Sequence, residues 1–179
     1  MKKPQITVQQ IMQAALDIAA DKGAGKVTLD AVAKASGLSK GGLLYHFPSK
    51  EALISAMVQH LLDNAEQNRL QLAQADASVL VSLLKARRLF SQSVSGNTAM
   101  AILAAAAEQP ALLQPIQQHN IKVLAEVLAE QRHELEAMLL MLASEGLLFQ
   151  ELLTISPFSE EQKAKLEQYM INRAQELKQ

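Results

Sequence analysis

The sequence of 179 residues contains no cysteine and no tryptophan, and only 3% of its residues are aromatic. The lack of cysteine excludes disulfides, thiolate metal sites and cysteine nucleophiles. Glycine and proline are also scarce, with seven and five residues, so few turns interrupt the chain. Ala, Leu, Gln, Glu and Met are abundant instead, and these residues favour helices. The composition therefore predicts an all-α protein rather than a sheet protein.

The sequence also lacks a hydrophobic run that could cross a membrane. The longest windows without charged residues, such as residues 89–107, contain Ser, Gln, Gly, Asn and Thr. Lys2 and Lys3 are not followed by an apolar run, so we expect no signal peptide. We therefore expect a cytoplasmic protein that has no membrane partner.

The net charge is close to zero, but its distribution is uneven. Residues 1–50 contain seven lysines and three aspartates, a net charge of +4, whereas the remainder carries a net charge of −5. A basic amino-terminal segment on an acidic body indicates a polyanionic partner for the first fifty residues. Ordinary surface charge is the alternative explanation.

Apolar periodicity and capping residues predict several short helices near the start of the chain. A first helix over residues 8–22 has Ile11, Ala15, Ile18 and Ala19 on one face. A second helix begins at Thr28 and ends at Gly37, because Thr is a good N-cap and Gly a good C-cap. Ser39 caps a third helix, which ends near Phe47 because Pro48 disfavours helical geometry before it. A fourth helix starts at Ser49 and extends beyond residue 68.

The second and third helices, joined by the turn of residues 36–39, form a helix-turn-helix pattern over residues 28–47. The second helix of such a motif enters the DNA major groove with its amino-terminal end first. This explains two adjacent glycines, Gly41 and Gly42, which disfavour a helix but allow close approach of the backbone to DNA. Lys40 is placed to reach guanine or phosphate oxygens, and Tyr45 and His46 to donate hydrogen bonds to the DNA backbone. Leu43 and Phe47 lie on the opposite, inward face.

The rest of the chain is predicted to be helical as well. We expect helices over residues 79–92, 98–108, 112–131 and 134–153, and a last helix capped by Ser159. Residues 93–97 and the segment before Ser159 are predicted loops. The prediction is about nine helices in all, with an amino-terminal three-helix DNA-binding domain at residues 1–49 and a larger helical domain at 50–179.

The first third of the chain resembles the TetR family of bacterial transcriptional regulators. The resemblance is carried by Ile11, Ala15 and Gly23, by Thr28, Val32 and Ala33, by Gly37-Leu38-Ser39-Lys40-Gly41, and by the string YHFPSKEAL at residues 45–53. The remainder is similar to the family only in helical content and length.

This resemblance implies a homodimer that binds a palindromic double-stranded DNA operator. By position, Thr28, Tyr45, His46 and Lys50 match phosphate-contacting residues, and Lys40, Gly41 and Gly42 match base-reading residues. Ser39, the cap of the recognition helix, is counted with these candidates. Lys2 and Lys3 would form an arm in the minor groove. The sequence departs from the family where Leu44 replaces a frequent Tyr and Ala19 replaces a frequent Phe.

The same resemblance implies a pocket for a small-molecule effector in residues 50–179. The candidate pocket residues are Met57, Leu61, Met100, Leu103, His119, Met138 and Met141, because Met adapts to varied apolar shapes. Methionines at helical spacing also occur in ordinary cores, and this alternative stays open.

The last two helices are the candidate dimer interface. The helix over 134–153 is apolar on more than one face and must be buried on several sides. Paired with the final helix and with the symmetry mates, it would form a four-helix bundle; burial within one chain is the alternative. The candidate residues are Leu135, Leu139, Leu142, Gly146, Phe149, Leu166, Tyr169 and Met170.

Other motifs are weak. The segment GAGKVT, residues 23–28, resembles the end of a phosphate-binding loop, but Ala20 and Val27 stand where that loop needs Gly and Ser or Thr. His60, His119 and His133 have no second histidine at metal-binding spacing, and no metal, cofactor or catalytic site is predicted.

The sequence thus predicts a transcriptional regulator that is not an enzyme, most simply a homodimeric repressor released from its operator by a small apolar or amphipathic ligand. A helical small-molecule enzyme and a helical ligand-binding or interaction module without a DNA role remain the alternatives.

Overall fold

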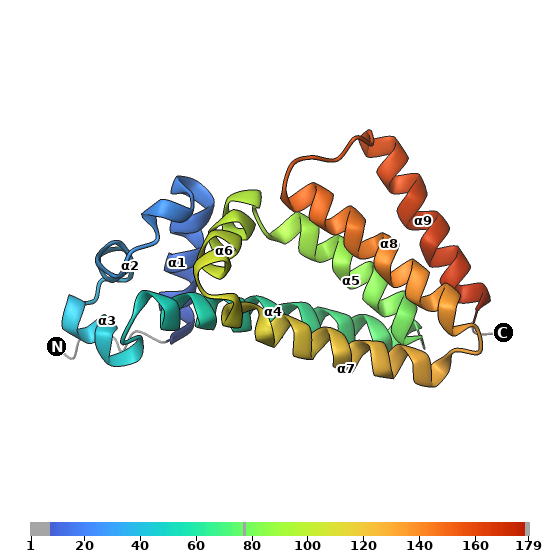
Figure 1. Ribbon diagram of the computed structural model, residues 1–179, viewed down its shortest axis with the longest axis horizontal. Helices are drawn as coiled ribbons and strands as arrows, with labels where there is room; N and C mark the ends of the chain where they lie inside the picture. The colour runs from blue at the N-terminus through green and yellow to red at the C-terminus, as the bar shows by residue number, and fades with distance from the viewer. Residues whose placement is uncertain (1–7, 77, 178–179) are drawn as a thin grey trace. The chain divides into compact units, whose positions relative to one another are not determined.

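The computed structural model describes residues 8–76 and 78–177, and within these ranges it contains nine α-helices, two short 3₁₀ helices and no strand (Figure 1). The helices are α1 (Val8–Lys22), α2 (Leu29–Ser36), α3 (Lys40–His46), α4 (Lys50–Asp76), α5 (Val79–Ser93), α6 (Gly96–Glu108), α7 (Gln114–Glu130), α8 (Glu134–Leu152) and α9 (Glu160–Glu176). The 3₁₀ helices are η1 (Ala24–Lys26) and η2 (Pro110–Leu113). The all-α prediction with about nine helices is confirmed. No helix in the described ranges is both long enough and apolar enough to cross a membrane.

The starts of two helices differ from the sequence prediction by two residues each. The helix expected from Thr98 begins at Gly96, which shortens the predicted loop to residues 94–95. The helix expected from about Leu112 begins at Gln114, and the residues before it form η2. Pro115 explains this second difference, because a proline is tolerated only in the first turn of an α-helix.

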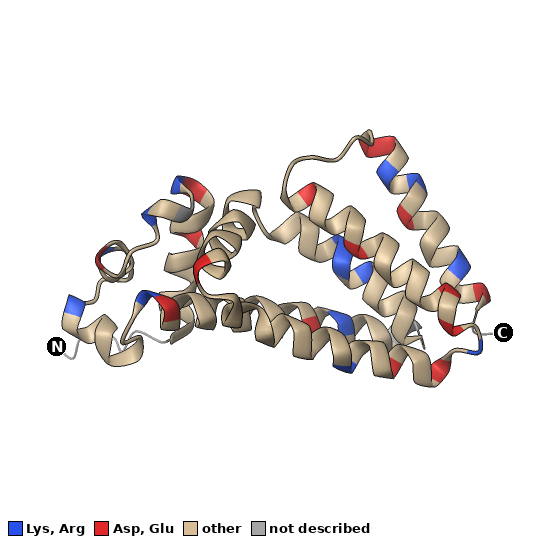
Figure 2. Ribbon diagram, in the orientation of Figure 1, with Lys and Arg blue, Asp and Glu red and all other residues tan. Residues whose placement is uncertain are grey.

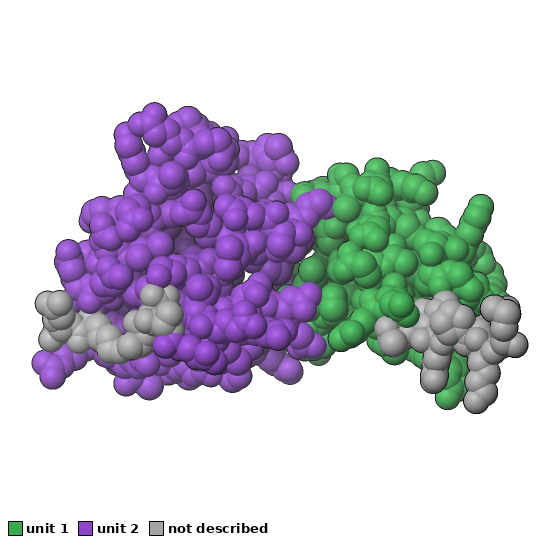
Figure 3. Space-filling model, turned by 180° about the vertical axis from the view of Figure 1, so that it is seen from behind, with its two compact units in different colours: residues 1–61, 96–115 green, residues 62–95, 116–179 purple. Residues whose placement is uncertain are grey.

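The chain forms two compact units, coloured separately in Figure 3. Unit 1 comprises residues 1–61 and 96–115, and unit 2 comprises residues 62–95 and 116–179. The sequence predicts a DNA-binding domain that ends at residue 49 and a second domain that begins at residue 50. This division by function stays a prediction. The compact units nevertheless add a feature that the sequence did not predict, since α6 belongs to the same unit as α1–α3.

The core of unit 1 is built from α1, α2, α3, α6 and the first turns of α4. The predicted inward residues of α3, Leu43 and Phe47, are buried in this core together with Ile11 and Leu53. Helix α6 packs on α1, and the side-chain amide of Asn97 donates a hydrogen bond of 2.7 Å to the backbone oxygen of Ala20. The three helices that carry the helix-turn-helix therefore rest on one continuous apolar core.

The core of unit 2 joins α5, α7, α8 and α9, and it contains a buried charged cluster. Only 3% of the Arg69 side chain is exposed, and its guanidinium donates two hydrogen bonds to Glu66, at 2.7 and 2.8 Å, and one to Glu126, at 2.7 Å. Lys122 lies 3.4 Å from Glu66 and 3.7 Å from Glu126. These hydrogen bonds lower the pKa of Glu66 and raise the pKa of Arg69, so both groups stay charged.

Candidate nucleic-acid interface

Local capping interactions define the helix-turn-helix of unit 1. The hydroxyl of Thr28 accepts a hydrogen bond of 3.2 Å from the backbone of Ala31 and so caps α2. Gly37 ends α2 with a φ of 73°, a left-handed conformation that favours glycine. The hydroxyl of Ser39 then caps α3 by accepting a hydrogen bond of 3.1 Å from the backbone of Gly42. The predicted helix-turn-helix is therefore confirmed.

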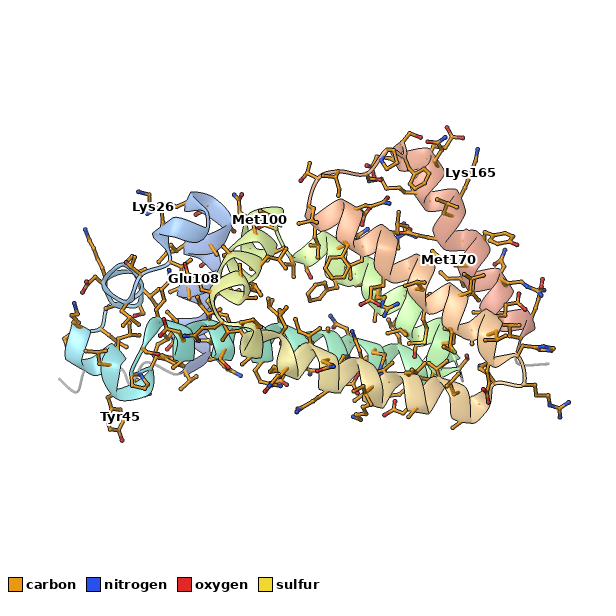
Figure 4. All side chains as sticks on the ribbon, viewed as in Figure 1. Lys26, Tyr45, Met100, Glu108, Lys165 and Met170 are labelled. Atoms are coloured by element: carbon orange, nitrogen blue, oxygen red, sulfur yellow. The ribbon has the colours of Figure 1, made fainter. Side chains whose placement is uncertain are left out.

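Helix α3 presents one face to the core and the other to solvent. Leu43 and Phe47 are buried, whereas Lys40, Gly41 and the last two residues of the helix are exposed. Tyr45 is 86% exposed, and its ring projects away from the helix (Figure 4). His46 packs edge-on beside it, with 5.3 Å between the ring centroids. The tyrosine ring is therefore accessible to an external partner.

The structure distinguishes the two glycines that open α3. A Cβ atom on Gly41 would have no atom within 4 Å outside its own helix backbone and neighbours, so no packing in the chain requires glycine there. A Cβ on Gly42 would lie 3.3 Å from the hydroxyl oxygen of Ser39 and 3.6 Å from Leu38. Gly42 therefore has a reason within the fold, the tight N-cap, whereas no contact among the described residues requires glycine at position 41.

This difference predicts opposite effects of two alanine substitutions on stability. Gly41→Ala is expected to raise the free energy of unfolding by about 0.5–1 kcal/mol, because alanine favours the helix and meets no clash. Gly42→Ala is expected to give no gain, because a displaced Ser39 cap costs about 1 kcal/mol. Urea unfolding of the two variants measures the difference. Equal stabilisation by both would show that the cap tolerates the added methyl group.

Lys40 has a partner that the sequence did not reveal. Its ammonium nitrogen lies 3.0 and 3.1 Å from the two carboxylate oxygens of Asp30, on α2. Both side chains are largely exposed, 61% for Lys40 and 69% for Asp30, so the pair contributes less than about 1 kcal/mol. Asp30 lies in the first turn of α2, and ten residues of separation across a turn give no periodic signal for such a pair. Lys40 is therefore held in place yet free to exchange Asp30 for another anion.

Lys50 occupies the first turn of α4, where the Ser49 hydroxyl accepts a hydrogen bond of 3.1 Å from the backbone of Ala52. Among the described residues up to position 50, all five lysines and all three aspartates are exposed. Figure 2 marks the positions of charged residues along the ribbon. Lys2 and Lys3, the expected minor-groove arm, lie outside the described residues. Leu44 is 36% exposed and provides no polar group where the family often has Tyr.

The candidate pocket residues divide between the two units, so neither unit holds all of them. Met57, Leu61, Met100 and Leu103 belong to unit 1, and the other three, His119, Met138 and Met141, belong to unit 2. Met57 and Met141 are buried, whereas Met100 and Met138 are 51% and 42% exposed (Figure 4 labels Met100). Burial lowers the pKa of His119, which keeps its imidazole neutral at pH 7. An effector pocket formed by these residues stays a prediction.

The candidate dimer residues of α8 and α9 are exposed, with the exception of Met170. Leu135, Leu139, Leu142, Phe149 and Tyr169 are 83%, 63%, 67%, 46% and 66% exposed, and Leu166 and Gly146 are exposed too. Packing among the described residues therefore does not cover this apolar surface. Met170 differs, because it is 7% exposed and packs in the core of unit 2 (Figure 4). Met170 follows Tyr169 by one residue and is rotated about 100° around α9 from it, toward the core of unit 2.

Comparison with known proteins covers both parts of the chain. Residues 11–57 match the family model described as bacterial regulatory proteins, tetR family, and residues 75–175 match the model described as tetracyclin repressor-like, C-terminal domain. The HTH-type transcriptional regulator RutR of Escherichia coli K12 is 45% identical over 53 residues, which are 30% of this chain and 25% of that protein. The chain thus matches about a quarter of the length of this curated relative.

Solved structures share the fold along nearly the whole chain. A transcriptional regulator from Rhodococcus sp. Rha1 superposes with a TM-score of 0.72 at 19% identity and covers 94% of both chains. A member of the TetR family from Streptomyces coelicolor A3 gives a TM-score of 0.68 at 20% identity, covering 94% of this chain and 96% of the other. At this identity the likeness concerns the fold alone.

Proposed function

The chain belongs to the TetR family of bacterial transcriptional regulators, and we propose that it acts as a homodimeric repressor that binds a palindromic operator through α3. The observation that carries this proposal is the exposed face of α3. It combines a glycine that the fold does not require, Gly41, with an exposed lysine, Lys40, and a tyrosine that is 86% exposed.

The chemistry of this face suits the major groove. Backbone at Gly41 can approach base edges closely, and Lys40 can exchange Asp30 for guanine oxygen or phosphate. Tyr45, His46, Thr28 and Lys50 are donors that fix the position of the helix on phosphates. Two copies related by two-fold symmetry would reach successive major grooves, with the recognition helices about 34–36 Å apart.

A small apolar or amphipathic molecule is proposed as the effector that releases the operator. Helix α4 is the proposed lever, since only three residues separate it from α3 and it continues as one helix to Asp76. A ligand can shift this equilibrium only as far as it prefers the state that does not bind DNA. An effector that leaves operator affinity unchanged would contradict this mechanism.

Selection of random double-stranded DNA by the purified protein tests the function. The experiment is done at about 150 mM salt, where non-specific phosphate binding is weak. An enriched palindrome with half-sites about one helical turn apart is the expected result. Absence of enrichment both before and after refolding, which removes a co-purified ligand, would contradict DNA binding.

Two lysine substitutions should separate base reading from phosphate binding. Lys40→Met is expected to lower affinity for the operator about tenfold while changing affinity for unrelated DNA less. Lys50→Gln is expected to weaken binding to all sequences alike and to reduce the slope of log K against log salt by about one. Fluorescence anisotropy over a salt series measures both quantities.

Lys165→Gln, on an exposed lysine of α9, is the matched control and should change neither quantity (Figure 4). Gly41→Ala adds a test whose result cannot be explained by a loss of stability. This variant should bind the operator more weakly although its free energy of unfolding is not lowered. If the substitutions of Lys40, Lys50 and Gly41 all leave operator affinity unchanged, this result would contradict the proposal that α3 is the recognition helix.

A further inference from the structure

A cavity of about 220 Å³ lies within unit 1 between the beginning of α4 and helix α6. Its floor is apolar and buried, and includes Ile54 and Met57 from α4 and Ala101 from α6. Ala105, one turn further along α6, also lines it. The side chain of each of these alanines is a single methyl group, so α6 contributes little bulk to this side of the cavity. Protein interiors are normally filled, and an unfilled apolar cavity costs stability.

The edge of the cavity carries charge of mainly one sign. Glu51, in the first turn of α4, and Glu108, the last residue of α6, line it together with Lys50 (Figure 4 labels Glu108). The last turn of α6 adds backbone carbonyl groups, which form the negative end of the helix dipole. Hydrogen bonds from its own backbone N–H and from the Ser49 hydroxyl lower the pKa of Glu51, so its carboxylate is ionised at neutral pH. At this edge, the negative charge of two carboxylates and a helix C-terminus therefore exceeds the positive charge of one lysine.

We propose that this cavity binds a small amphipathic amine, with its apolar body against Met57, Ala101 and Ala105 and its ammonium group beside Glu51 and Glu108. The apolar floor has no polar group to satisfy a buried hydroxyl or amide, whereas the edge offers carboxylates to a cation. The proposal rests on the proposed function in one respect, that the bound amine acts as an effector of DNA binding. Binding itself is measured without DNA, so failure of this site and failure of DNA binding can be told apart.

The site lies beside a residue that the proposed function places on DNA. Lys50 borders the cavity and begins the helix that follows α3. An amine bound between α4 and α6 would contact both helices of the same unit and would influence the first turn of α4. Of the candidate pocket residues, Met57 alone lines this cavity.

Titration of the full-length protein with 2-phenylethylamine tests the proposal by calorimetry. We expect saturable binding with a Kd of about 1 mM or tighter, as suits so small a ligand. 2-Phenylethanol, the neutral analogue, should bind at least about fivefold more weakly, because it lacks the charge that pairs with the carboxylates. Phenylacetate, the anionic analogue, should bind more weakly still.

Ala105→Leu fills the cavity and should abolish amine binding, whereas Ala107→Leu makes the same change at an exposed residue of α6 and should preserve it. Glu108→Gln alters only an exposed side chain, so it keeps the fold and should weaken amine binding about threefold. Amine binding that Ala105→Leu and Glu108→Gln both leave unchanged would overturn the site. Equal binding of phenylacetate would overturn the ligand class, and absence of saturable amine binding would overturn the proposal as a whole.

Discussion

Leu142→Glu is expected to make the protein monomeric and to lower its operator affinity at least about 100-fold, because a dimer gains this much from binding two half-sites at once. The reason lies on α8. Leu135, Leu139, Leu142 and Phe149 follow a helical spacing that places them on one face, and each is at least 46% exposed. A contiguous apolar surface of this kind on a folded chain marks a protein interface.

A glutamate at the middle of this surface would have to be buried without a partner in the dimer. Burial of an unpaired carboxylate costs several times the free energy of the leucine contact that it replaces. The monomer should remain folded, because Leu142 is 67% exposed and contributes little to the core of its own unit. Loss of dimerisation should therefore be separable from loss of stability.

Size-exclusion chromatography with light scattering measures the mass, and fluorescence anisotropy measures operator affinity. Ile121→Glu, on α7, is the matched control because Ile121 is 61% exposed and lies outside the α8–α9 surface. The control should remain dimeric and bind the operator. A dimeric Leu142→Glu variant, or a monomeric wild-type protein, would contradict the interface assigned to α8 and α9.

Arg69→Met is expected to lower the free energy of unfolding by about 3 kcal/mol at pH 7, because removal of one partner from a buried ion pair leaves the other charge uncompensated. The guanidinium of Arg69 is 3% exposed and donates hydrogen bonds to Glu66 and to Glu126. Without it, the Glu66 carboxylate, of which 17% is exposed, keeps only Lys122 at 3.4 Å. The methionine fills a similar volume, so the loss should reflect charge rather than a cavity.

The effect of Arg69→Met should depend on pH in a defined direction. The pKa of Glu66 is lowered in the folded protein, chiefly by the hydrogen bonds from Arg69. This stabilisation is present above the ordinary carboxyl pKa and is lost as pH falls through the lowered value. The wild-type protein therefore loses this stabilisation in acid, whereas the variant lacks it at every pH. The difference in the free energy of unfolding between the two proteins should shrink below about pH 4.

Urea unfolding at pH 7 and at about pH 3, below the ordinary carboxyl pKa, measures both effects. Arg132→Met removes an exposed arginine from the turn after α7 and should change stability by less than about 0.5 kcal/mol. The double variant Arg69→Met with Glu66→Leu should recover part of the loss, because it removes the stranded carboxylate. A loss below about 1 kcal/mol for Arg69→Met would show that the cluster acts as an ordinary surface pair.

The helix-turn-helix could be predicted from the sequence because its signals are local. Thr28 and Ser39 each accept a hydrogen bond from a backbone N–H three residues later, and Gly37 adopts the left-handed conformation that ends α2. Each signal involves residues within one helical turn, so the residue types and their spacing suffice. The spacing of Leu43 and Phe47 likewise determined which face of α3 is buried.

Features that join distant residues required the tertiary structure. The sequence placed the alanine-rich helix outside the amino-terminal three-helix domain, yet α6 packs on α1 because Asn97 and its neighbours meet residues almost eighty positions earlier. The pair of Lys40 with Asp30 and the cluster of Arg69 with Glu126 arise in the same way.

The sequence by itself determined the helices, their caps, the outward face of α3 and the family of the chain. Only the tertiary structure decided that Gly42 serves the cap while Gly41 serves nothing inside the fold, and that Ala101 and Ala105 leave a cavity opposite Met57. The physical reason is the separation along the sequence of the residues that each kind of interaction joins. Capping and periodicity depend on neighbours within about four residues, whereas packing depends on the shapes of side chains that only the folded chain brings together.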